Sequence, residues 1–325
     1  MGCPLTGWLR TGFDTFGVSA PRNVCGKEQP RGHTAQGTMI RLQLQINLDY
    51  TVLEPGADFF FYIHAACTPH QQVPTEHLTV SPDTAHWEIQ QSQNVGQRCL
   101  RVRAQPGPLQ LEYTATVEID HHMADPSQIP EVPVHQLPLE ALGYIYPSRY
   151  CESDRLSQFA MKQFGDLPMG YSRAQAICQW VQQHVTFRSN SSDGSTSAVD
   201  TLVERVGVCR DFAHLMIALC RACNLPARFV TGTDYGADPA LGPPDFHAYV
   251  EVYLGDRWYL FDPSGTAIPM GMMRLATGRD AADVAFSTIF GPVVSEAPRI
   301  QVLVEHSEER QWLWPVHTQM GLSTA

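Results

Sequence analysis

The 325-residue sequence is poor in positive charge and lacks long apolar runs. It contains 22 Lys and Arg residues against 33 Asp and Glu residues, which gives a formal net charge of −11. Nucleic-acid-binding proteins concentrate basic residues, so we expect no nucleic-acid partner. No apolar run approaches the roughly 20 residues that cross a bilayer, so we expect no membrane partner. A D-x-D-x-D-G calcium loop is also missing, and nothing in the sequence indicates a metal ion or another cofactor.

The cysteine pattern favours a reducing compartment. Nine cysteines are present, an odd number at irregular spacing. Several lie in apolar helical or strand-like contexts, where a reduced cysteine behaves as a small apolar residue. The N-terminal segment also lacks the apolar core of a signal peptide. We therefore expect a cytoplasmic protein and no disulfide framework.

Composition and periodicity divide the chain into five segments. Apolar residues alternate strictly with polar ones over 40–50 and over 109–119, as in half-buried strands. Five prolines interrupt the region from 126 to 147, which indicates a linker. Helical periodicity begins near Ser153 and gives way to strand-like segments, which favours an α+β domain. We predict a disordered N-terminal extension over 1–38, a β-sandwich domain over 39–122, a Pro-rich linker over 123–150, an α+β domain over 151–310 and a C-terminal tail over 311–325.

The stretch from Gly207 to Leu219 predicts a buried helix with a cysteine at its start. Apolar residues recur at helical spacing at positions 212, 215, 216 and 219. Asn224 and Pro226 are typical of a helix end. Cys209 lies in the first turn, where the positive end of the helix dipole favours the thiolate, which is the nucleophilic form.

A predicted hairpin brings a histidine and an aspartate to its open end. Gly255-Asp256 is a turn signal between two strand-like segments. Positions whose numbers sum to about 511 then face each other, so His247 and Asp262 lie within about two residues of register. The carboxylate can fix the tautomer of the imidazole and stabilise its protonated form. Cys209, His247 and Asp262 are therefore the candidate catalytic residues, as nucleophile, base and orienting carboxylate.

The segments around these three residues resemble the transglutaminase-like superfamily. His247 follows Cys209 by 38 residues and Asp262 follows 15 residues later, which is the order and spacing of that family. The matching segments are Gly207-Val208-Cys209-Arg210-Asp211-Phe212-Ala213, Asp245-Phe246-His247-Ala248-Tyr249-Val250-Glu251-Val252 and Trp258-Tyr259-Leu260-Phe261-Asp262-Pro263. A bacterial subgroup labelled as cysteine-protease candidates also has a β-rich N-terminal domain and a segment similar to Ser148-Arg149-Tyr150-Cys151-Glu152-Ser153-Asp154.

The resemblance covers most of residues 40–305. It implies a catalytic domain of α+β class, related to papain-like proteases, in which the cysteine helix packs on an antiparallel sheet that bears His247 and Asp262. Ser264 stands where the family leads us to expect threonine. Residues 1–38 have no recognised counterpart.

Two neighbours of Cys209 on the same helix have other expected roles. His214 lies five residues further along, about 140° around the helix axis, which favours a supporting hydrogen bond or packing over a role as the base. Arg210 either helps to hold the thiolate or forms a structural salt bridge. Cys220 and Cys223 form a C-x-x-C match at the far end of the helix, where redox or metal chemistry is disfavoured.

The remaining candidates concern the substrate and the linker. We expect the backbone N–H of Cys209 and a group from the loop 190–200 to form the oxyanion hole. The segments 189–197 and 232–246 are expected to shape the pocket, with Tyr235 and Phe246 flanking an acyl chain. His121-His122 is interpreted as a surface or turn pair, because no further ligand follows at a spacing typical of a metal site.

The sequence thus predicts a thiol-dependent acyl-transfer enzyme that acts on a peptide or protein substrate through a thioester. Hydrolysis by a cysteine peptidase or amidase is favoured over transfer to an amine, because no second amine-binding module is evident. A transglutaminase-type reaction and a non-catalytic binding or scaffold role remain the alternatives. The sequence leaves the oligomeric state and the identity of the substrate undetermined.

Overall fold

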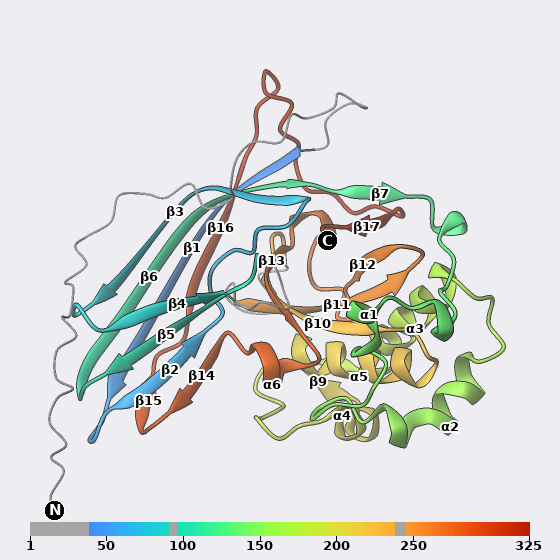
Figure 1. Cartoon of the computed structure of the whole chain (residues 1–325), viewed down its shortest axis with the longest axis horizontal. Helices are drawn as coiled ribbons and strands as arrows, with labels where there is room; N and C mark the ends of the chain where they lie inside the picture. Colours follow the sequence, from blue (N-terminus) through green and yellow to red (C-terminus); the bar gives the residue numbers. More distant parts are fainter. Residues whose placement is uncertain (1–38, 91–95, 238–244) are drawn as a thin grey trace, which may run out of the picture.

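Alternating strands build a two-sheet sandwich at the left of Figure 1. The computed structural model describes residues 39–90, 96–237 and 245–325, so the predicted N-terminal extension over 1–38 lies outside the described residues. The first sheet consists of β15 (Val293–Ser295), β1 (Met39–Val52), β6 (Gly107–Asp120) and β3 (Gln71–Ser81), with β16 (Arg299–Glu305) also paired to β1. The second sheet consists of β14 (Ser287–Phe290), β2 (Ala57–Phe61), β5 (Arg98–Ala104) and β4 (His86–Gln90).

The core of the sandwich follows from the alternation in β1. Its even-numbered residues from Ile40 to Val52 are buried, whereas the odd-numbered ones are partly or fully exposed. Successive side chains of a strand point to opposite faces, so one face of β1 is apolar throughout. Phe59 and Phe61 of β2 stack on each other and contact Tyr50 from the opposing sheet. The sandwich predicted from residues 40–119 is thus present, but it is not complete in that range.

Strands from the end of the chain complete the sandwich. Strand β16 pairs with β1 over seven residues, Leu44 facing Val302, and β14 pairs with β2, Phe59 facing Ile289. The expected boundaries placed residues 287–305 in the α+β domain over 151–310, and the strand pairings correct this. Strand β1 has two edges, β6 covers only one of them, and a later strand of matching alternation is needed for the other.

The linker and the tail are both ordered against the second part of the molecule. Residues 122–142 form β7 (His122–Ala124), η1 (Pro126–Gln128), η2 (Val134–Gln136) and α1 (Leu139–Leu142). Glu131 in this segment forms a buried ion pair with Arg173. The predicted tail over 311–325 contains β17 (Gly321–Ser323), which is buried and pairs with β7 along the upper edge of Figure 1. The linker is therefore held by specific contacts, which its proline content did not indicate.

The second part of the molecule is an antiparallel sheet covered by helices, as the predicted α+β class requires. Its sheet runs in the order β12 (Arg257–Phe261), β11 (Phe246–Leu254), β10 (Ala227–Thr233) and β13 (Met273–Gly278). Its remaining elements are α2 (Ser153–Phe164), α3 (Tyr171–His184), β8 (Thr186–Phe187), α4 (Ala198–Glu204), β9 (Val206–Gly207), α5 (Cys209–Ala222), η4 (Pro269–Gly271) and α6 (Ala281–Val284). Helix α5 packs on β10 and β11 and is surrounded by α2, α3 and α4.

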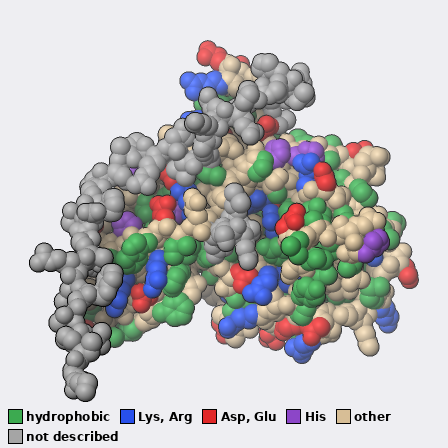
Figure 2. All heavy atoms as spheres, viewed as in Figure 1, with side chains coloured by type: hydrophobic (Ala, Val, Ile, Leu, Met, Phe, Trp, Pro, Cys, Tyr) green, Lys and Arg blue, Asp and Glu red, His purple; other side chains and the backbone are tan. Residues whose placement is uncertain are grey.

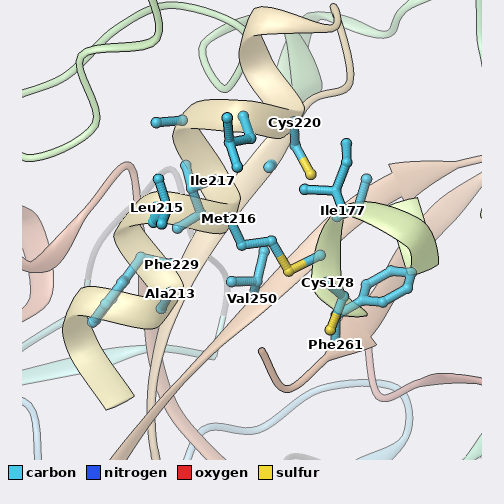
Figure 3. Close-up of a cluster of buried hydrophobic side chains, with 14 of the residues drawn as sticks. Ile177, Cys178, Ala213, Leu215, Met216, Ile217, Cys220, Phe229, Val250 and Phe261 are labelled. Carbon is cyan, nitrogen blue, oxygen red and sulfur yellow. The ribbon is translucent and has the colours of Figure 1, made fainter. Parts of the chain in front are cut away.

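Helix α5 is apolar on nearly every side. Figure 3 shows Met216 reaching from α5 across Val250 of β11 toward Cys178 of α3. Cys220, one turn further on, points toward Ile177. All these side chains are at most 4% exposed, and full burial of a side chain of this size contributes about 1.5–3 kcal/mol. Such packing on all sides fixes the position of the first turn of α5.

A buried ion-pair network ties the sheet together. Glu251 on β11 is fully buried and accepts hydrogen bonds from Arg228 on β10, at 2.7 Å, and from Arg274 on β13. Burial acts to raise the pKa of Glu251, but the two guanidinium groups hold it below its ordinary value. Arg228 also lies over the ring of Trp258 on β12, 4.2 Å from the ring centroid. The network thus joins all four strands of the sheet that carries the candidate site.

Most cysteines in the described part of the chain are reduced and buried. The free cysteines of the described part of the chain are Cys99, Cys151, Cys178, Cys209, Cys220 and Cys223. Cys67 is disulfide-bonded. The cytoplasmic location stays a prediction.

The surface carries both signs of charge. On the face drawn in Figure 2, the Lys and Arg side chains are interspersed with Asp and Glu side chains. No helix within the described ranges is long and apolar enough to cross a membrane.

Candidate active site

Cys209 is the first residue of α5 and is separated from the short strand β9 by one residue, Val208. Its side chain is partly exposed, unlike those of the other free cysteines. The carboxylate of Asp211 accepts a hydrogen bond of 2.8 Å from the backbone N–H of Val208, which fixes the entry of the chain into the helix. Gly207 is required there, because a Cβ at this position would lie 2.7 Å from the Cβ of Asp211. The thiol is therefore held at a helix N-terminus, where N–H groups and the helix dipole favour negative charge.

The hairpin has the register expected from the sequence. Val250 faces Phe261 and Leu254 faces Arg257, so paired positions sum to 511. Asp262 comes directly after β12, and His247 is the second residue of β11, opposite Gly232 of β10. Both side chains are only 3% exposed.

His247 and Asp262 form a hydrogen-bonded pair. The distance from Nε2 of His247 to Oδ1 of Asp262 is 3.3 Å. Asp262 also accepts hydrogen bonds from the hydroxyl of Ser264, at 2.6 Å, and from the backbone N–H of Ala267, at 3.3 Å. Burial acts to raise the pKa of Asp262, but His247 and these donors hold it below its ordinary value. Ser264 thus supplies the hydroxyl that we expected from a threonine.

The structure brings all three candidate residues together. Cys209 lies next to His247 and interacts with its ring, and His247 is hydrogen-bonded to Asp262. Burial acts to lower the pKa of His247, but Asp262 and Cys209 raise it well above its ordinary value. A raised pKa means that the ring keeps its proton, which is the state that pairs with a thiolate.

The sequence did not point to a second carboxylate beside His247. Asp234, one residue beyond the end of β10, places Oδ2 3.6 Å from Nδ1 of His247. The segment 232–246 was expected to shape the pocket, but no residue in it was singled out as a partner of the histidine. The pairing of Gly232 with His247 is the signal that locates Asp234, and that pairing depends on the order of strands in the sheet.

Arg210 anchors the polar loop next to the site. Its guanidinium donates to the backbone oxygen of Asp193 at 2.5 Å and to the carboxylate of Asp211 at 3.2 Å. Of the two roles left open for Arg210, the structure contains the salt bridge. This contact holds the loop 189–197 against the start of α5, on the side where an oxyanion-hole donor was expected. That the loop 190–200 supplies this donor stays a prediction.

The two expected pocket residues, Tyr235 and Phe246, make different contacts. The ring of Phe246 stacks on Phe286 with centroids 4.2 Å apart. The backbone oxygen of Tyr235 accepts a hydrogen bond from Ile268. Their contact with an acyl chain stays a prediction, and residues 238–244 of the expected pocket segment lie outside the described residues.

His214 is held by structural contacts. His214 is fully buried, stacks on Tyr150 and accepts a hydrogen bond from the backbone of Ala281 through Nε2. Burial, with Arg210 and Arg221 nearby, lowers the pKa of His214 well below its ordinary value, so the ring is neutral. The supporting role expected for His214 agrees with these contacts.

The C-x-x-C cysteines and the first histidine of the His121-His122 pair are buried. Cys220 and Cys223 are free and at most 3% exposed. His121 is only 5% exposed, which corrects its interpretation as a surface residue, while His122 is partly exposed on β7. No group of three or more potential metal-binding side chains occurs among the described residues.

Comparisons with known proteins bear on the family and the fold of the chain. Residues 157–263 match a family model described as the transglutaminase-like superfamily, and residues 40–140 match one described as bacterial transglutaminase, N-terminal domain. A crystal structure from Cytophaga hutchinsonii, described as "a Putative Cysteine Protease", has a TM-score of 0.81 and 36% sequence identity. That alignment covers 88% of this chain and 98% of the other.

Mycobacterial relatives share a shorter region. An uncharacterized protein of Mycobacterium leprae is 29% identical over 115 residues, which is 34% of this chain and 41% of that protein. An uncharacterized protein of Mycobacterium tuberculosis is 36% identical over 110 residues, which is 30% of this chain and 35% of that protein. The chain therefore spans well under half the length of these curated relatives.

Proposed function

The chain belongs to the transglutaminase-like superfamily, and on that premise we propose that it is a thiol-dependent acyl-transfer enzyme with Cys209 as its nucleophile. The observation that carries the proposal is the position of His247, which lies next to Cys209 and is hydrogen-bonded to Asp262. A neutral structural histidine, such as His214, has no such pair of partners.

The proposed reaction begins with proton transfer from the thiol to the imidazole. Because Asp262 engages Nε2, the nitrogen that exchanges a proton with Cys209 is Nδ1. The thiolate attacks the acyl carbon of an amide, and the carbonyl electrons move onto the oxygen. Collapse of this intermediate breaks the carbon–nitrogen bond, and the imidazolium gives its proton to the leaving amine. A thioester on Cys209 remains.

The second half of the reaction regenerates the thiol. A water molecule gives up a proton to Nδ1 of His247 and attacks the thioester, which releases the acid and returns the proton to the sulfur. We propose the backbone N–H of Cys209 as one oxyanion donor, since it lies at the N-terminus of α5. We favour water over an amine as the acceptor, in line with the description of the Cytophaga hutchinsonii structure as "a Putative Cysteine Protease". A peptidase or amidase acting on a peptide or protein is the outcome proposed.

Selective alkylation tests whether Cys209 is the nucleophile. Iodoacetamide at pH 6 is expected to modify Cys209 first, because a paired thiolate reacts there while a buried thiol does not. Burial raises the pKa of Cys151, for example, to about 12. Peptide mapping by mass spectrometry locates the label, and Cys209→Ala should fold normally and lose the fast-reacting site. Slow labelling of Cys209, at the rate of the buried cysteines, would instead support a binding or scaffold protein.

A substrate screen then separates the two kinds of acyl transfer. A peptide and isopeptide library is incubated with the protein, with and without an added primary amine. Hydrolysis products that do not depend on the amine are expected. Products that incorporate the amine in preference to water would favour the transglutaminase-type alternative, and Cys209→Ala should abolish both.

A further inference from the structure

The imidazole of His247 lies between two carboxylates. Asp262 is 3.3 Å from Nε2, and Asp234 is 3.6 Å from Nδ1, at the opposite edge of the ring. The side chain of Asp234 is only 12% exposed, so water screens this approach weakly. Two acidic groups from different loops, one after β10 and one after β12, thus face one buried ring.

We propose that Asp234 is a positioning residue that holds His247 in its protonated form and sets the upper pH limit of acyl transfer, in which the imidazolium protonates the leaving amine. This inference rests on the proposed function, because it assigns His247 the role of proton carrier for Cys209. It adds a residue to the three that the spacing of the sequence indicates.

The geometry assigns the two carboxylates different tasks. Asp262 receives hydrogen bonds from Ser264 and Ala267 as well as from His247, so its position is fixed from three sides. Asp234 is slightly too far from Nδ1 for a good hydrogen bond, but well within the range where an opposite charge stabilises an ion. Nδ1 is left free to exchange its proton with Cys209 while the ring keeps a second negative partner.

The other groups that face the ring do not replace Asp234. On the approaching elements these are Cys209 at the start of α5 and Tyr249, whose ring centroid is 6.4 Å away on β11. Asp245, just before β11, adds a further negative charge near Asp234. The basic residue next to Cys209, Arg210, is engaged by Asp211 and by the loop at Asp193. The described surroundings of the imidazole therefore favour its positive form.

Asp234 is expected to be ionised in the alkaline range, where it acts on His247. Burial, with Asp262 and Asp245 nearby, raises its pKa, while His247 acts to lower it. A raised carboxyl pKa weakens the effect of Asp234 in acid, where the ring is protonated in any case. In alkali the carboxylate is charged, and there it resists the loss of the proton from His247. The consequence is therefore expected on the alkaline side of the pH profile.

The test is a direct titration of His247 in the full-length protein. The ring signals of a protein labelled with ¹³C-histidine are followed by NMR, and the His247 signal is assigned by its loss in His247→Gln. Asp234→Asn keeps the shape of the side chain and removes its charge. We expect its titration midpoint to fall by at least about one pH unit, as for loss of an opposite charge within 4–6 Å. Asp234→Glu should restore most of the shift.

The matched control is Asp256→Asn at the hairpin turn, where the side chain is 79% exposed. It should leave the His247 midpoint unchanged. Asp234→Ser is titrated in parallel in case Asp234→Asn fails to fold, and failure of both variants to fold would assign Asp234 a structural role and overturn the proposal. A folded variant that lacks the charge and titrates as the wild type does would overturn it as well.

Alkylation of Cys209 separates this inference from the proposed function. If the midpoint stays fixed in Asp234→Asn while His247→Gln slows the alkylation, the inference about Asp234 fails and the proposed function stands. If His247→Gln leaves the alkylation rate unchanged, the proposed function fails, and the inference about Asp234 fails with the proposed function.

Discussion

Replacing Asp262 by asparagine tests the centre of the proposed site without removing a side chain. Oδ1 of Asp262 accepts from His247 and from the hydroxyl of Ser264, while Oδ2 accepts from the N–H of Ala267. An asparagine can keep its oxygen in the Oδ1 position and turn its NH₂ group toward Ala267. The NH₂ group of the asparagine and the backbone N–H of Ala267 are then two donors that face each other, but Nε2 of His247 still meets the amide oxygen as an acceptor. The substitution therefore removes the charge and leaves the tautomer of the ring in place.

The size of the effect follows from the distance between the two groups. Unit charges 3.3 Å apart interact by about 5 kcal/mol at an effective dielectric constant of about 20. Asp234 still faces the ring after the substitution, and the pocket relaxes, so we expect about half of this energy to be lost. A loss of about 2.7 kcal/mol corresponds to an approximately 100-fold change.

The assay is the second-order rate of Cys209 alkylation by iodoacetamide at pH 6. This rate reports the thiolate paired with a protonated His247, and it requires no knowledge of the substrate. We expect Asp262→Asn to be about 100-fold slower, with Asp256→Asn as the unchanged control. A decrease of less than about threefold, in a variant that melts as the wild type does, would refute the role assigned to Asp262.

Three further predictions concern stability. Glu251→Gln leaves two buried arginines without a negative partner, so urea unfolding should show a loss of about 3–5 kcal/mol in the free energy of unfolding. The control Glu305→Gln, in a partly exposed ion pair, should change the free energy of unfolding by less than about 1 kcal/mol. Burial lowers the pKa of His121 from its ordinary value of 6.5 to about 4. Between these two pH values the unfolded chain binds a proton that the folded protein does not, so the stability of the fold decreases as the pH falls from 6.5 toward 4. His121→Phe should flatten that part of a melting-temperature profile, and an unchanged slope would contradict the assignment. Gly207→Ala forces Asp211 to move and should cost about 0.5–2 kcal/mol in thermal unfolding through loss of the helix cap.

The sequence was informative where one local rule decides the structure. The alternation from Ile40 to Tyr50 defines the buried face of β1, because a strand has only two faces. The Gly255-Asp256 turn sets the hairpin register, so the proximity of His247 and Asp262 could be predicted to within a residue or two. The resemblance to a known family supplied the packing of α5 on the sheet. The catalytic roles themselves stay predictions.

The features that the sequence did not indicate depend on contacts between distant segments. Nothing in the alternation of residues 299–305 says that the partner is β1 and not a strand of the second sheet. Strand β17 is three residues long, too short for any period to be visible. Asp234 approaches His247 only because β10 lies beside β11, a neighbour relation that many strand orders would not produce. His121 precedes a second histidine in a polar-looking pair, and only the tertiary packing buries it.

The pairing of β1 with β16 has a consequence for biosynthesis. When β1, β2, β5 and β6 have left the ribosome, the nascent chain already contains most of the sandwich, but one edge of β1 and one edge of β2 have no partner. Those edges carry apolar residues and are templates for pairing with other chains. They are covered only after the whole of the segment that carries Cys209 and His247 has been translated. The sandwich therefore begins with the first described strand but is completed only after the Cys209 and His247 segment has been translated. The nascent protein needs protection from aggregation at these open strand edges for most of its synthesis.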